Sequence, residues 1–168
     1  MEGAQRGKTA MFTIREIYDL AIQIERNGEA FYRDAATKVS NPALKALFEH
    51  LADEEVNHIK TFSQKKDALG PAQDRTGLDE SGTAILRGLL GDQTFSLKEV
   101  NLSEIEREKD LISLAVEFEK DTILFYDMIS AFIDDPQTAA RIKEIVEEEN
   151  RHVQLLEAYD HQEGGEEE

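Results

Sequence analysis

The chain has 168 residues, of which 40% are apolar and 33% are charged, and its formal net charge at pH 7 is −17. This length is enough for one domain with a substantial core, whereas so negative a surface argues against nucleic-acid binding because it repels phosphate groups. The sequence contains no cysteine, which excludes disulfides, iron–sulfur clusters and thiol nucleophiles and leaves oxygen and nitrogen atoms as the metal ligands.

The two ends of the sequence are polar. Met1–Ala10 lacks the apolar segment of a secretory signal, and no apolar run in the chain approaches the ~20 residues that span a bilayer. We therefore expect a cytoplasmic protein without a membrane partner. Residues 163–168 contain only glycine and glutamate, and we expect them to form a disordered acidic tail after a single domain at residues 1–162.

The first two predicted elements form a helical hairpin. Residues 13–39 show the apolar spacing that is typical of an α-helix, and so does the segment that continues to about residue 66. Asn41-Pro42 between them combines a helix N-cap with a proline at the first helical position. So short a break requires the two helices to lie side by side and antiparallel. The apolar stripe of the first helix consists of Ile14, Ile17, Tyr18, Ala21, Gly28, Tyr32 and Ala35.

A long connection follows at residues 67–102. It contains the turn-forming pair Gly70-Pro71 and then an amphipathic stretch around Ala84 and Leu90, which predicts a short helix within a crossover. A connection of this length can traverse a helical bundle, so the next helix could run parallel to the second one.

Two further helices are predicted after the crossover. The third spans about residues 103–133, and Ser103 with Glu106 could form a capping box at its start. The fourth begins at Asp135-Pro136, again an N-cap followed by proline, and ends near Tyr159. These helices make a second hairpin.

The second hairpin repeats the first. Asp135-Pro136 lies 94 positions after Asn41-Pro42, and the same offset relates further residues without a gap. We infer an internal duplication that covers about residues 13–66 and 107–160. The predicted fold is therefore all-α: a four-helix bundle of two antiparallel hairpins, joined by a long crossover that contains a short helix.

Six side chains that can bind transition metals follow the same repeat. Counted from the turn of each hairpin, its two glutamates lie at the same height to within one residue, or about 1.5 Å. At about 100° per residue they point along the apolar stripes, so all six groups are predicted to point inward. The first set is Glu25, Glu55 and His58, and the second set, 94 positions later, is Glu119, Glu149 and His152.

Four glutamates at one height inside a bundle need a compensating charge, because a buried charge without a partner is very costly. Two divalent cations would balance four carboxylates, and the two histidines would add ligands without charge. A single Glu-x-x-His motif more often belongs to a solvated helix face. Two copies, each matched by an inward glutamate, favour a site for two metal ions.

The sequence around these motifs resembles a known family. It is similar to the ferritin-like di-iron carboxylate superfamily, and most closely to its rubrerythrin-like branch. The resemblance implies that all six residues bind two iron ions and that Glu55 and Glu149 bridge them. Manganese or zinc could take the place of iron in vitro. The stretches that carry the resemblance are residues 21–32, 53–58, 115–126 and 147–152.

The sequence departs from the rubrerythrin pattern in two places. Because it has no cysteine, it has no rubredoxin module, and the resemblance then implies an external electron donor. Rubrerythrins also carry an additional glutamate one turn after the first glutamate of the third helix. That position is Thr122 here, and its counterpart in the first helix is Gly28.

Two tyrosines lie close to the motif on the same helices. Tyr32 and Tyr126 each follow the first glutamate of their hairpin by seven residues, which places them almost on the same side of the helix. Each hydroxyl could bind a ligand carboxylate or relay an electron, and each ring could equally be ordinary core packing.

Other acids and histidines have weaker geometry. Glu29 could join the site, but we expect it at the rim. Glu54 and Glu148 lie at the edge of the stripe, where each could pair with the histidine four residues later in its own helix. His50 and His161 have no matching carboxylate and are expected at the surface.

Three functions are compatible with this pattern. The first is an oxidoreductase that oxidises Fe(II) and reduces hydrogen peroxide or O2. The second is iron handling as a ferroxidase, carrier or storage protein. The third is a non-catalytic helical scaffold, which is disfavoured because it would bury four repelling carboxylates. We expect a homodimer or higher homo-oligomer, since the crossover could be exchanged between protomers.

Overall fold

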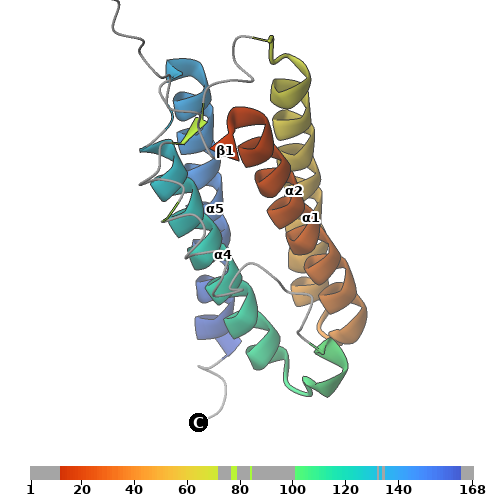
Figure 1. The fold of residues 1–168 in the computed structure, drawn as a ribbon. Helices are drawn as coiled ribbons and strands as arrows, with labels where there is room; N and C mark the ends of the chain where they lie inside the picture. The colour runs from red at the N-terminus through yellow and green to blue at the C-terminus, as the bar shows by residue number, and fades with distance from the viewer. Residues whose placement is uncertain are drawn as a thin grey trace, which may run out of the picture.

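The computed structural model describes residues 12–71, 77–78, 84, 101–131, 133 and 135–163. Within these residues, four long helices form a bundle (Figure 1). A short 3-10 helix, η3, spans Leu102–Glu104. The long helices are α1 (Ile14–Lys38), α2 (Pro42–Asp67), α4 (Glu108–Ser130) and α5 (Pro136–Glu163). The predicted all-α bundle of two hairpins is confirmed.

Polar caps begin three of the four helices. Thr13 forms a capping box with Glu16 at the start of α1. The side chain of Asn41 accepts hydrogen bonds from the first amides of α2, and Asp135 accepts one from the amide of Thr138 at 2.8 Å. The predicted Asn-Pro and Asp-Pro starts of the second and fourth helices are therefore confirmed.

The start of the third helix was predicted wrongly. Helix α4 begins at Glu108, and its N-cap, Arg107, makes no side-chain cap. Ser103 donates its backbone amide to the side chain of Asn101 at 3.2 Å, so this segment closes the tight turn of η3 instead of opening an α-helix. In the part of the chain that the structure describes, Ser103 and Glu106 form no capping box.

The ends of the second hairpin also differ from the prediction. Helix α4 ends at Ser130, before the expected residue 133. Helix α5 continues past Tyr159 to Glu163, because glutamate and glutamine extend a helix readily even where no apolar stripe requires it. The expected acidic tail therefore begins inside the helix at Glu163, and residues 164–168 lie outside the described part.

The first hairpin ends and the second begins at opposite ends of the bundle. Figure 1 shows that α2 ends and α4 begins at opposite ends, so these two helices are parallel as predicted. Two strands that the sequence did not predict, β1 (Phe12–Thr13) and β2 (Gly77–Leu78), pair antiparallel. The short helix expected within residues 67–102 falls largely outside the described residues.

The core consists of two apolar clusters, one towards each end of the bundle. The first includes Ile17, Phe62 and Phe125, and the second includes Phe48 and Leu51. Along each helix the metal-binding side chains fall between these clusters. No helix in the described ranges contains an apolar stretch that could cross a bilayer.

Replacing Leu51, which is fully buried, by alanine should lower the free energy of unfolding by about 2–5 kcal/mol, because it leaves a cavity in the core. The matched substitution Leu155→Ala removes a side chain that is 44% exposed and should change stability by less than about 0.5 kcal/mol. Urea unfolding monitored by circular dichroism measures both values. Equal losses would contradict this packing.

Candidate metal centre

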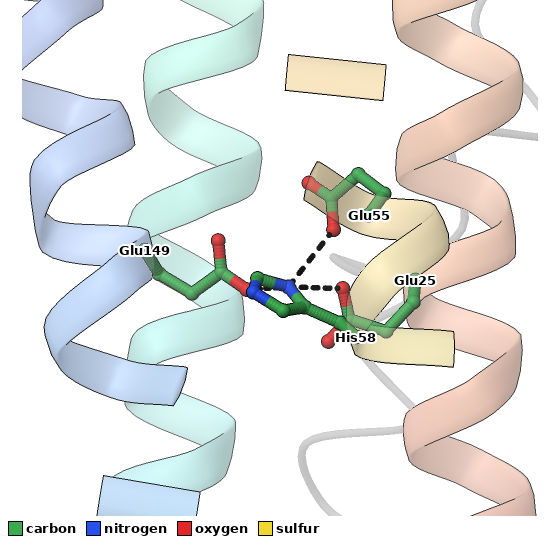
Figure 2. Close-up of side chains that lie close together, drawn as sticks. All are labelled: Glu25, Glu55, His58 and Glu149. Atoms are coloured by element: carbon green, nitrogen blue, oxygen red, sulfur yellow. Dashed lines mark hydrogen bonds and ion pairs between the residues drawn. The ribbon is translucent and has the colours of Figure 1, made fainter. Parts of the chain in front are cut away.

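The structure brings all six candidate ligands together in one layer of the bundle. Each hairpin supplies one glutamate from its first helix and a glutamate and a histidine from its second helix. None of the six residues is more than 3% exposed. Figure 2 shows four of them, Glu25, Glu55, His58 and Glu149, converging from α1, α2 and α5.

The six side chains form two overlapping groups of four. One group is Glu25, Glu55, His58 and Glu149, and the other is Glu55, Glu119, Glu149 and His152. Within each group, one possible ligand atom from every residue lies within 4.8 Å of the others. Glu55 and Glu149 belong to both groups, which is the arrangement that two bridging carboxylates require.

Both histidines direct Nδ1 towards the carboxylates. Nδ1 of His58 lies 3.3 Å from Glu25, 3.4 Å from Glu55 and 3.0 Å from Glu149. Nδ1 of His152 lies 2.8 Å from Glu149 and 3.4 Å from Glu119. The two rings are nearly parallel, with centroids 5.9 Å apart. Nδ1 is therefore the ligand atom that each ring offers.

Several atoms of this layer lack any hydrogen-bond partner within the described residues. They are both carboxylate oxygens of Glu55 and of Glu149, Oε2 of Glu119 and Nδ1 of His152. Unpaired buried polar atoms are rare in folded proteins because each one costs free energy. Two divalent cations would satisfy these atoms, and a set of oxygen and nitrogen donors suits iron or manganese. The residues present therefore fit a centre of two metal ions.

Two buried tyrosines connect the hairpins through this layer. Tyr32 on α1 donates its hydroxyl hydrogen bond to Glu119 on α4, and Tyr126 on α4 donates to Glu25 on α1. Each tyrosine thus binds the glutamate of the opposite hairpin rather than the one seven residues before it. Burial and the charge of the bound glutamate raise both tyrosine pKa values well above the usual range. Both hydroxyls therefore remain protonated donors.

A further acid reaches the centre from the second hairpin. Nε2 of His58 lies 2.7 Å from Oε2 of Glu148. The sequence left open a pairing of Glu148 with His152 in its own helix, but in the structure Glu148 pairs with His58 instead. Because α2 and α5 are antiparallel neighbours, the Glu148 side chain points across to α2. No periodicity along a single helix could have revealed this pair.

The remaining candidates lie away from the centre. Glu29 forms an ion pair with Arg33 at 3.8 Å, and a third of its side chain is exposed, which agrees with a position at the rim. Glu54 makes no ion pair or hydrogen bond with His58, four residues later in its own helix, within the described residues. His50 and His161 are exposed.

The rubrerythrin family profile matches residues 16–159 of this chain. The protein belongs to the rubrerythrin family. Among solved structures, it is similar to a protein of Thermotoga maritima whose name describes it as ferritin-like and diiron-carboxylate. That similarity has a TM-score of 0.66 and 22% identity and covers 92% of this chain and 98% of the other, so it shows the fold. No curated protein matches the chain.

Position 122 is the place where the rubrerythrin pattern has an additional glutamate. Thr122 is buried and donates its hydroxyl hydrogen bond to the backbone oxygen of Phe118 at 2.9 Å, so it supplies no further carboxylate. Its counterpart Gly28 lies against the centre: a Cβ there would approach Phe118 to 3.0 Å and the Glu55 carboxyl group to 3.2 Å. Because Gly28 has no Cβ, the side chains of Phe118 and Glu55 can pack against its backbone.

Protons balance the charge of the metal-free rubrerythrin centre. Burial and the neighbouring carboxylates raise the pKa of Glu55 well above its usual range, and burial and Glu149 raise that of Glu119 to about 8. Burial alone would raise the pKa of Glu149 too, but the two neighbouring histidines lower it to about 2. Burial disfavours both imidazolium ions, but the neighbouring carboxylates raise the pKa of His58, and they raise that of His152 to about 10.

Metal binding should therefore release protons and tighten as the pH rises. At neutral pH the raised pKa values keep Glu119 and His152 protonated in the metal-free protein, so a cation must displace those protons. Calorimetric titration with Mn(II) at about pH 6 and about pH 8 measures the affinity, and buffers of different ionisation enthalpy measure the protons released. An affinity independent of pH over this range would contradict the protonated layer.

Proposed function

We propose that this protein is a di-iron oxidoreductase that oxidises Fe(II) and reduces hydrogen peroxide or O2. The observation that carries the proposal is the pair of overlapping ligand groups that share Glu55 and Glu149. Membership of the rubrerythrin family supports a metal-binding diiron protein. Carboxylates suit this chemistry because they bind iron in both oxidation states, whereas the absence of cysteine excludes thiolate ligands.

When bound, two Fe(II) ions supply the two electrons that convert one hydrogen peroxide molecule and two protons into two water molecules, and both ions end as Fe(III). In this proposal Glu25 and His58 would hold one ion, Glu119 and His152 would hold the other, and Glu55 and Glu149 would contribute to both positions. Mn(II) or Zn(II) could occupy the same ligands in purified protein.

The tyrosines have a positioning role in this proposal. The hydroxyl hydrogens of Tyr32 and Tyr126 hold Glu119 and Glu25 in place from the opposite hairpin. A carboxylate that accepts such a bond keeps its remaining lone pairs for a cation. Because both phenols stay protonated, they can also keep a proton beside the centre.

The size of the substrate follows from the burial of the centre. The candidate ligands are at most 3% exposed, and the two apolar clusters pack beyond them in both directions along the bundle. A small oxidant such as O2 or hydrogen peroxide fits such a site better than a bulky organic substrate. Since the chain has no cysteine and no rubredoxin module, an external electron donor would return the iron to Fe(II).

Anaerobic loading with Fe(II) followed by one equivalent of hydrogen peroxide should give a rapid ferric absorbance change. The double substitution Glu25→Ala and Glu119→Ala should slow it by at least about 100-fold, since even residues that only support metal ligands account for about 10–100-fold. The exposed His50→Ala is the matched control and should react like the unaltered protein. Iron oxidation no faster than in buffer would contradict the proposal.

The same preparation separates peroxide reduction from iron handling. With an added electron donor, an oxidoreductase consumes many equivalents of peroxide for each centre. A ferroxidase or storage protein takes up and oxidises iron without a donor. Light scattering measures whether the chain forms the closed shell that storage requires or a smaller oligomer.

Removing metal should lower the melting temperature. A metal present at about 100 times its dissociation constant stabilises the folded state by about 2.7 kcal/mol, which for a chain of this size corresponds to about 5–10 °C. Scanning calorimetry before and after chelation, with magnesium as the control cation, measures the shift. An unchanged melting temperature would favour the non-catalytic scaffold.

A further inference from the structure

The duplicated sequence predicts two equivalent halves of the centre, but the structure makes the two histidines unequal. Nε2 of His58 is 2.7 Å from the carboxylate of Glu148, whose side chain is 26% exposed. The counterparts 94 positions apart are His152 and Glu54. Within the described residues these two make no such bond. One half of the centre therefore has a supporting carboxylate that the other half lacks.

The supporting carboxylate has a direct chemical consequence. In the metal-bound form, Nε2 of His58 would donate its hydrogen to Glu148 and leave the lone pair of Nδ1 for the cation, on the side that faces the carboxylates of the centre. A carboxylate on the far nitrogen fixes both the tautomer and the ring orientation, and it makes the imidazole a stronger donor to a cation. His152 directs Nδ1 into the centre in the same way, but no carboxylate of the described residues lies on its far nitrogen.

The carboxylates are also arranged unequally around the two rings. Three of them, from Glu25, Glu55 and Glu149, lie within 3.4 Å of Nδ1 of His58. Two, from Glu119 and Glu149, lie within this distance of Nδ1 of His152. Both differences favour the His58 half as the place where a cation finds more ligands already in position.

We propose that the two metal positions fill in a defined order, with the first ion at Glu25, Glu55, His58 and Glu149. Glu148 is the positioning residue that makes this position the tighter one. The second ion binds more weakly at the position that contains Glu119 and His152. The inference rests on the proposed function in requiring metal ions at this centre, but it concerns their binding and not their reaction.

The test is an anaerobic titration of the metal-depleted protein with Co(II), followed by its visible absorption and by calorimetry. The protein should bind two ions with different dissociation constants. Because the shared carboxylates would weaken a second ion even in a symmetrical centre, the decisive comparison is between two matched variants. Glu148→Gln and Glu54→Gln remove the same charge from equivalent positions of the repeat.

Glu148→Gln should raise the first dissociation constant by about 10–100-fold, the usual effect of losing a residue that supports a metal-binding histidine, and bring it close to the second. Glu54→Gln should change neither constant. The conservative variant Glu148→Asp should restore part of the difference, since it restores the charge. Circular dichroism and melting temperatures of the metal-free variants check that all of them fold.

Equal effects of Glu148→Gln and Glu54→Gln would overturn the inference, and so would a first constant that Glu148→Gln leaves unchanged. These results are independent of the oxidoreductase proposal. Ordered binding of Co(II) without any reaction of the Fe(II) protein with peroxide would support the inference and contradict the proposed reaction. If the Fe(II) protein reduces peroxide but Glu148→Gln and Glu54→Gln have equal effects on metal binding, the proposed reaction would be supported and the ordered binding contradicted.

Discussion

Burial of four carboxylates in one layer is the constraint on which this structure depends. Each of these glutamates is at most 1% exposed, and carboxylates so close together cannot all be ionised without a compensating charge. In the metal-free protein, protons provide this charge. Burial raises the pKa of Glu55 and Glu119, and the neighbouring carboxylates keep His58 and His152 charged. Cations in the same layer would replace those protons. Protonation and metal binding are therefore alternative ways to satisfy one set of buried atoms.

The same constraint explains how the two hairpins are held together. The apolar clusters keep water away from the layer, so polar atoms that face outward from it need partners within the protein. Tyr32, Tyr126 and Glu148 are such partners, and each of them reaches across from the opposite hairpin. Away from the centre, the hydroxyl of Tyr18 donates to Thr138 at 3.1 Å and adds another buried link between the hairpins. The centre is thus both the candidate functional site and part of the packing between the two halves of the bundle.

Internal duplication accounts for the approximate symmetry of the centre, and its exceptions make the halves different. Glycine at position 28 leaves room for Phe118 and Glu55, whereas Thr122 at the equivalent position binds the backbone of its own helix. Glu148 supports one histidine, while Glu54 does not support the other. A duplicated hairpin that accumulates such differences can give each of two neighbouring metal positions its own affinity.

The sequence by itself determined the helices, the two hairpins and the inward direction of the six candidate ligands. These features depend on local rules: the helical period sets the direction of Glu25 or Glu149, and the distance from the turn sets its height. The start of α4 was mispredicted because Asn101 and Ser103 close a competing turn. Pairing of β1 with β2 was not predicted, since each strand has only two residues and its partner is distant in the chain. Only the tertiary structure decided that Tyr32 binds Glu119 and that Glu148 binds His58, because these contacts depend on how one hairpin packs against the other, and the period of a single helix carries no information about that packing.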